Sequence, residues 1–114
     1  TGTALVVDDE DLVRMTTADM LIDLGYRVIE ASSGEAAMRL IDEGVRFDVL
    51  VTDHLMPGMT GTDLAYAVRE LTPERPVLIV SGYAETAGID ATLPRLTKPF
   101  RRDDLAASLS QLRS

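Results

Sequence analysis

The sequence contains no cysteine, which removes several kinds of chemistry at once. Disulfides, thiolate zinc sites and cysteine nucleophiles are excluded, and the absence fits a reducing compartment, so we expect a cytoplasmic location. No apolar run approaches the roughly 20 residues that a membrane-spanning helix needs, and we expect no membrane insertion. The chain starts with neither a signal peptide nor an initiator methionine, so we expect a processed chain or a domain cut from a longer protein.

Positive charge is also scarce. Only 11 lysines and arginines face 19 aspartates and glutamates, which gives a net charge of -8. No basic stripe is available to neutralise phosphates, so we expect no direct contact with nucleic acid. With 46% hydrophobic and 26% charged residues, the 114 residues are expected to form one domain, 1–114, around a single core.

Apolar runs and amphipathic segments alternate along the chain. Strands are predicted at 3–7, 26–31, 47–53, 77–80 and, more briefly, 94–99. The first of them is a continuous apolar run, which is typical of a strand buried on both faces. Helical periodicity is found at 12–25, 32–44, 61–70 and 101–114. Ser32 and Glu35 are predicted to form a capping box at the start of the second helix. Segment 84–92 has poor helical periodicity, so we expect a single turn or a loop there.

This alternation predicts an α/β fold, a doubly wound five-stranded parallel sheet with helices on both faces and right-handed crossovers. We expect the fourth helix to be shortened or missing. We assume the flavodoxin-like strand order 2-1-3-4-5 from the fold type, because alternation alone does not determine it.

Polar side chains follow the strands at the points where they end, and these are Asp8, Asp9, Asp53, Ser81 and Lys98. Ligands of open parallel sheets bind beyond the carboxyl ends of the strands. If the first and third strands are neighbours, the three aspartates share one pocket. Three carboxylates in one pocket repel each other unless a cation is present.

The ligands in this pocket would all be oxygen atoms, which favours a hard cation. Mg²⁺ suits the pocket because it takes a few carboxylates, keeps waters and pairs with phosphate oxygens. Lys98 would add a second positive charge and Ser81 a hydroxyl. Such groups around one carboxylate would neutralise and orient a transferring phosphoryl group, so Asp53 is a candidate phosphoacceptor.

Each of these residues also has a purely structural interpretation. Asp8 and Asp9 could cap a helix, and Asp53 could form the turn that follows it. Ser81 could be only a turn residue, and Lys98 a solvated surface lysine. Their convergence at one edge of one sheet favours the site.

His54 and two nearby methionines are interpreted without a functional role. If side chains alternate along the strand, His54 points away from Asp53, and we take it as an incidental polar residue rather than a metal ligand or phosphate carrier. Met56 and Met59 are expected to pack in the core.

The stretches LVVDDE, DVLVTDHLMPGMTG, VSGYA and TKPF, in this order and spacing, resemble the receiver domain of two-component response regulators. The similarity runs from about Leu5 to Leu109. The resemblance implies that Asp53 takes a phosphoryl group from a histidine kinase or a histidine phosphotransfer protein and that phosphorylation switches the conformation. It implies a phosphoacceptor domain and not an enzyme, although the domain catalyses its own phosphotransfer and dephosphorylation.

The resemblance also implies roles for individual residues. Mg²⁺ would be bound by the side chains of Asp9 and Asp53, by Asp8 directly or through a water, and by the backbone carbonyl of Leu55. The phosphoryl group would lie against Leu55, Ser81, Gly82 and Lys98. In that set Ser81 matches the switch hydroxyl, Gly82 the small residue that leaves room for phosphate, and Lys98 the lysine that pairs with the phosphoryl oxygens. A cis peptide bond is expected before Pro99.

Two departures from the family pattern concern switching and assembly. Arg95 lies three residues before the lysine, where the family usually has tyrosine or phenylalanine, so we expect an electrostatic response there instead. The short segment between Ser81 and Lys98 lacks most of the helix through which many relatives dimerise. We therefore expect a monomer or a weak dimer.

Leu55 and Tyr83 lie two places beyond Asp53 and Ser81, at positions that flank the phosphoryl group in the family. Both are large and mostly apolar, so we expect them to shield the phosphoryl group from water and slow its hydrolysis. The stretch SGYAE is similar to receivers at the C-terminus of hybrid sensor histidine kinases.

Two other functions stay open on the sequence. A Mg²⁺-dependent phosphatase of the haloacid-dehalogenase type also has an aspartate nucleophile after a strand, and Asp8 with Glu10 could mimic its two acids. That interpretation leaves Asp53 and TKPF without a role, and the chain has no room for a substrate-capping domain. A pseudo-receiver that only binds partners is disfavoured because the residues of the predicted site are all present, namely Asp8, Asp9, Asp53, Ser81 and Lys98.

Overall fold

The computed structural model describes residues 2–82 and 92–112. Five parallel strands form one sheet in the order β2-β1-β3-β4-β5, which confirms the expected strand order. The strands are β1 Gly2–Val7, β2 Tyr26–Ala31, β3 Val49–Asp53, β4 Val77–Gly82 and β5 Arg95–Lys98.

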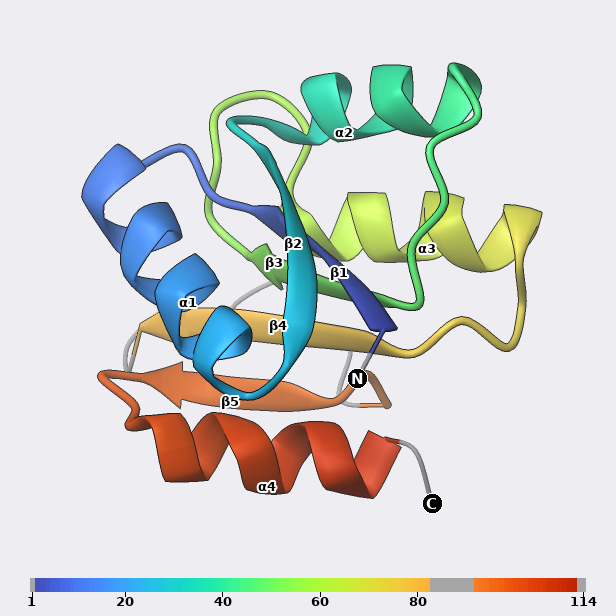
Figure 1. Ribbon diagram of the computed structural model, residues 1–114. Helices are drawn as coiled ribbons and strands as arrows, with labels where there is room; N and C mark the ends of the chain where they lie inside the picture. The colour runs from blue at the N-terminus through green and yellow to red at the C-terminus, as the bar shows by residue number, and fades with distance from the viewer. Residues whose placement is uncertain (1, 83–91, 113–114) are drawn as a thin grey trace.

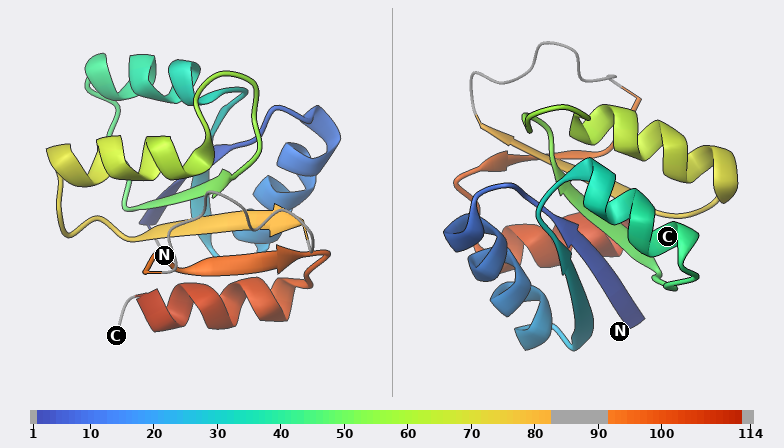
Figure 2. Two further views of the ribbon diagram at one scale, coloured as in Figure 1. Left: turned by 180° about the vertical axis from the view of Figure 1, so that it is seen from behind. Right: turned by 90° about the horizontal axis from the view of Figure 1, so that it is seen from above.

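Helices cover both faces of the sheet (Figures 1 and 2). The described helices are α1 Asp11–Asp23, α2 Gly34–Asp42, α3 Gly61–Leu71 and α4 Arg102–Leu112. Figures 1 and 2 show α2 and α3 over one face of the sheet and α1 and α4 over the other. The predicted doubly wound architecture is therefore confirmed.

The core consists of two apolar layers, one on each side of the sheet. Leu5, Val7 and Leu50 pack into the layer under α2 and α3. Val6 and Val51 pack into the layer under α1 and α4. Burying one such side chain contributes about 1.5–3 kcal/mol, so β1 and β3 are held from both faces. This packing explains why their sequences read as continuous apolar runs, and it holds the residues that follow them in place.

The predicted start of α2 is wrong by one residue. The helix is capped by Ser33, whose hydroxyl accepts a hydrogen bond from the Ala36 N–H at 3.0 Å, and not by Ser32. Ser33 has the extended backbone that a cap requires, with φ −159° and ψ 164°. Glu35 takes no part in the cap, and its carboxylate accepts the Met59 N–H at 3.1 Å.

Several further expectations can be compared with the structure. The Lys98–Pro99 peptide bond is cis, as expected. The expected turn or loop in place of a fourth helix lies mostly at 83–91, outside the described residues, and so does Tyr83. Within 2–82 and 92–112, no helix has the length and apolar character needed to cross a bilayer.

Candidate functional site

Three aspartates lie together at the carboxyl edge of the sheet. β1 and β3 are paired so that Val7 lies beside Thr52, which brings the residues that follow, Asp8 and Asp53, next to each other. Carboxylate oxygens of Asp8, Asp9 and Asp53 all lie within 4.8 Å of one another. Asp8 and Asp53 are buried, whereas Asp9 is exposed to solvent. The expected shared pocket is confirmed.

Lys98 reaches this pocket from the last residue of β5. Its Nζ lies 2.9 Å from Asp53 Oδ1 and 3.6 Å from Asp8 Oδ2. The lysine side chain is 23% exposed, while the side chain of Asp53 is only 5% exposed. A buried carboxylate is costly unless it is paired, so the ammonium group is an integral part of the pocket. Lys98 is therefore not a solvated surface lysine.

Ser81 presents a hydroxyl that no other described residue uses. The residue is fully buried near the end of β4, in register with Thr97 of β5. Among the described residues its Oγ has no hydrogen-bond partner. Leaving a buried hydroxyl without a partner costs about 1–3 kcal/mol, so a group that enters the pocket would gain by binding it. Gly82 follows, half-buried and in register with Lys98.

The loop after Asp53 is constrained by a glycine that the sequence did not single out. A Cβ on Gly61 would lie 2.0 Å from the backbone oxygen of Asp53. The Gly61 N–H also donates a hydrogen bond of 2.8 Å to the His54 carbonyl. Only glycine fits such a close approach of two backbones, and it places the start of α3 against the end of β3. Leu55, in this loop, is half exposed.

The His54 side chain is not part of the group that the three aspartates form. It is buried, and its Nδ1 lies 3.0 Å from the Thr62 hydroxyl on α3. In the described part of the chain, the group of potential metal ligands at this edge consists of the three aspartates without His54. Met56 is buried in the core and Met59 packs against it, as expected.

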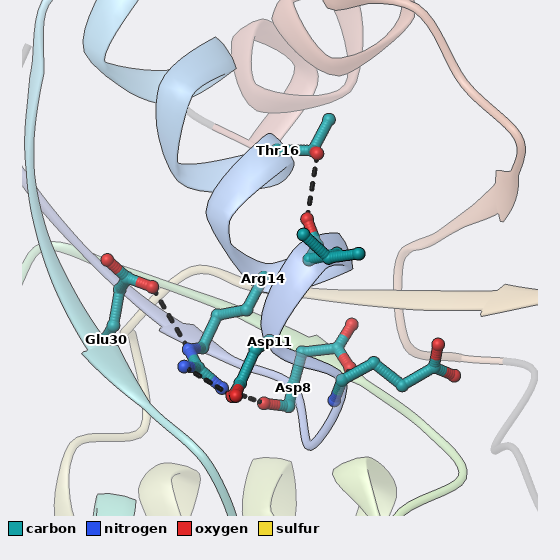
Figure 3. Close-up of polar contacts among 7 residues, drawn as sticks. Asp8, Asp11, Arg14, Thr16 and Glu30 are labelled. Atoms are coloured by element: carbon teal, nitrogen blue, oxygen red, sulfur yellow. Dashed lines mark hydrogen bonds and ion pairs between the residues drawn. The ribbon is translucent and has the colours of Figure 1, made fainter.

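Arg14 is a further residue at this edge that the sequence did not indicate (Figure 3). Its guanidinium contacts the side chains of Asp11 and Glu30 and donates to the backbone carbonyl of Asp8 at 2.9 Å. Burial opposes the charge on Arg14, but hydrogen bonds to Asp11 and Glu30 and their negative charges raise its pKa above the ordinary value. The only sign of this role in the sequence is that an arginine follows the acidic stretch 8–11 and lies on the helix after it, α1.

The donor set of the pocket fits Mg²⁺. Carboxylate oxygens from two neighbouring strands converge without any thiolate, and hard divalent cations prefer such ligands.

Arg95, the expected modulating residue, is exposed at the start of β5.

Residues 4–110 match the response regulator receiver domain. The chain belongs to this family. Receiver domains are components of two-component signalling, so the resemblance seen in the sequence is confirmed. Membership of this family also removes the haloacid-dehalogenase-type phosphatase as an interpretation.

The receiver domain is similar to part of a sensor kinase and to solved receiver structures. It is 38% identical over 117 residues to sensor kinase CckA of Brucella abortus (strain 2308), a match that covers 97% of this chain and 12% of that protein. The crystal structure of the receiver domain from hybrid histidine kinase CckA superposes with a TM-score of 0.82 at 33% identity, covering 99% of this chain and 100% of that chain. Response regulator TrrA of Thermotoga maritima, solved in complex with Mg²⁺-BeF, gives a TM-score of 0.85 at 25% identity, covering 98% of this chain and 99% of that chain.

Proposed function

We propose that this receiver domain accepts a phosphoryl group on Asp53 from a phosphohistidine of a histidine kinase or a histidine phosphotransfer protein. The observation that carries the proposal is the buried Asp53 carboxylate, 2.9 Å from the Lys98 ammonium and beside two further aspartates. A carboxylate oxygen of Asp53 attacks the phosphorus atom. A P–O bond forms while the P–N bond to the histidine breaks, and the histidine ring leaves.

Mg²⁺ is the proposed cofactor of this transfer. The side chains of Asp8, Asp9 and Asp53 and the backbone carbonyl of Leu55 would hold the ion. When bound, it supplies positive charge against the phosphoryl oxygens and the crowded carboxylates. TrrA, the similar protein solved with Mg²⁺-BeF, supports this assignment.

The remaining residues of the pocket would bind the phosphoryl group and respond to it. Lys98 neutralises a phosphoryl oxygen. The Ser81 hydroxyl, which has no hydrogen-bond partner among the described residues, donates a hydrogen bond to the phosphoryl group. Gly82 leaves room for the group. Movement of the Ser81 region toward the phosphoryl group is the proposed switch, to which Arg95 responds through its charge.

The proposed partner would dock on an apolar groove that borders the pocket. The groove holds about 310 Å³ and is lined by Leu12, Val13, Thr16, Thr17, Met20, Lys98, Pro99 and Phe100. Leu12 and Met15 on the same helix are 80% and 53% exposed. Because Lys98 both lines the groove and contacts Asp53, a partner seated there would bring its histidine to the acceptor. We infer an apolar surface on the partner.

A phosphorylation assay tests the proposal. The domain is incubated with Mg²⁺ and acetyl phosphate and weighed intact, beside Asp53→Asn and the control Asp42→Asn, which changes an exposed aspartate at the end of α2. We expect one phosphoryl group on the wild type and on the control, and none on Asp53→Asn. A wild type that gains no mass would favour a pseudo-receiver, and a gain that survives Asp53→Asn would move the acceptor elsewhere.

A single domain over 1–114, a cytoplasmic location, and a monomer or weak dimer stay predictions from the sequence.

A further inference from the structure

One guanidinium joins three segments beside the aspartate pocket (Figure 3). Arg14 Nη1 donates to the Asp8 carbonyl at 2.9 Å, and Nε donates to Glu30 Oε1 on β2 at 3.0 Å. Nη2 lies 2.9 Å from Asp11 Oδ1 at the start of α1. The arginine side chain is only 14% exposed, although both carboxylates that it contacts are more accessible to solvent. Arg14 thus links the end of β1 to β2 and α1.

The backbone and side chain of Asp8 are held from several directions. Its N–H donates to the Ala31 carbonyl at 3.2 Å, and its Oδ1 accepts the Glu10 N–H at 2.9 Å. Its carbonyl accepts from Arg14, while its Oδ2 faces Lys98 Nζ at 3.6 Å. The hydrogen bond from Arg14 to the Asp8 carbonyl therefore holds the peptide group that joins Asp8 to Asp9.

We propose that Arg14 is a positioning residue, which keeps the peptide between Asp8 and Asp9 in the arrangement that binds the divalent cation. Since that cation is Mg²⁺ in the proposed function, this role rests on that proposal. The planar guanidinium offers donors in a rigid fork, so it satisfies three acceptors in different directions, whereas a lysine ammonium on a flexible stem does not hold the same geometry.

Charge and geometry predict opposite effects for Arg14, and this makes the inference testable. As a positive charge near the pocket, Arg14 repels a cation, so a purely electrostatic role predicts tighter Mg²⁺ binding when the charge is removed. As a positioning residue, it lowers the cost of arranging the carboxylates, so its loss predicts weaker binding. The direction of the change distinguishes the two roles.

Calorimetric titration of the unphosphorylated domain with Mg²⁺, at constant ionic strength, measures this directly. We expect Arg14→Gln to weaken Mg²⁺ binding about 3- to 10-fold, below the range for partners of a ligand atom itself because the bond is to a backbone carbonyl. Arg14→Lys keeps the charge and is expected to weaken binding about 2- to 5-fold, since it loses the fork. Urea unfolding without metal shows whether each variant is folded.

The matched control is Arg102→Gln. It removes the same charge from an exposed ion pair, in which Arg102 Nη1 lies 3.1 Å from Asp23 Oδ2, and it should change the Mg²⁺ affinity less than about twofold. If the wild type binds Mg²⁺ and Arg14→Gln binds it equally or more tightly, the positioning role is refuted while the proposed function survives. If the wild type gives no binding, the Mg²⁺ site itself fails. Should Arg14→Gln not fold, Arg14→Lys decides by the same measurement, because it keeps the charge and loses only the fork.

Discussion

Replacement of Lys98 by methionine should destabilise the domain strongly in the absence of metal and less in its presence. The substitution keeps an apolar stem of similar length and removes only the ammonium group. That group lies 2.9 Å from Asp53 Oδ1 and 3.6 Å from Asp8 Oδ2, and both carboxylates are buried. Lys98→Met therefore leaves two buried acids facing each other without their counter-charge.

The size of the effect follows from these distances. At an effective dielectric constant near 20, the contacts at 2.9 Å and 3.6 Å are worth about 5.7 and about 4.6 kcal/mol of attraction. Desolvation of the charges offsets much of this attraction, and breaking a buried pair costs about 3–5 kcal/mol in practice. Because the Lys98 side chain is 23% exposed, we expect the lower value, about 3 kcal/mol. Mg²⁺ stabilises the wild type as well, so the loss shrinks only to the extent that the variant binds the ion more tightly. A tenfold gain in affinity, expected when the neighbouring ammonium group is removed, returns about 1.4 kcal/mol.

Urea unfolding followed by circular dichroism measures this effect, once with a chelator and once with saturating Mg²⁺. The matched control is Arg102→Met, which breaks an exposed ion pair with Asp23 and should cost under about 1 kcal/mol in both conditions. The reasoning is refuted if Lys98→Met is as stable as the wild type without Mg²⁺. It is also refuted if the loss is the same with and without the ion, because the carboxylates would then not be what Lys98 neutralises.

Three further predictions concern the loops around the pocket. Gly61→Ala places a Cβ 2.0 Å from a backbone oxygen and should cost about 3 kcal/mol in urea unfolding, whereas Gly44→Ala, at φ +91° in open space, should cost only about 1 kcal/mol; equal losses would contradict the steric explanation. By the same measurement, Ser33→Ala should lower the free energy of unfolding by about 1 kcal/mol and Ser32→Ala by less than about 0.5 kcal/mol. A larger loss for Ser32→Ala would restore the cap expected from the sequence. Leu55→Asn and Tyr83→Glu should each shorten the half-life of the phosphorylated domain by admitting water, and an unchanged half-life would remove their shielding role.

The order of the elements and their general positions could be predicted because they depend on local patterns. Largely apolar runs indicate strands covered on both faces, and β3 and the last four residues of β1 are buried in this way. The cap of α2 could not be assigned as securely, since two serines stand side by side and either hydroxyl could serve. Ser33 caps because it has the extended backbone from which its hydroxyl reaches the Ala36 N–H. That backbone conformation depends on how the chain leaves β2.

The gathering of the aspartates was determined by the sequence together with the assumed strand order. In a parallel sheet all carboxyl ends lie at one edge, so acids that follow neighbouring strands must meet. Only the tertiary structure decided how these side chains contact one another, and it added Arg14 to them. Lys98 reaches Asp53 across β4, the Ser81 hydroxyl finds no acceptor or donor among the described residues, and Arg14 holds the backbone of the acidic loop. These contacts depend on register and side-chain direction between residues distant in the chain, which local propensity and periodicity do not encode.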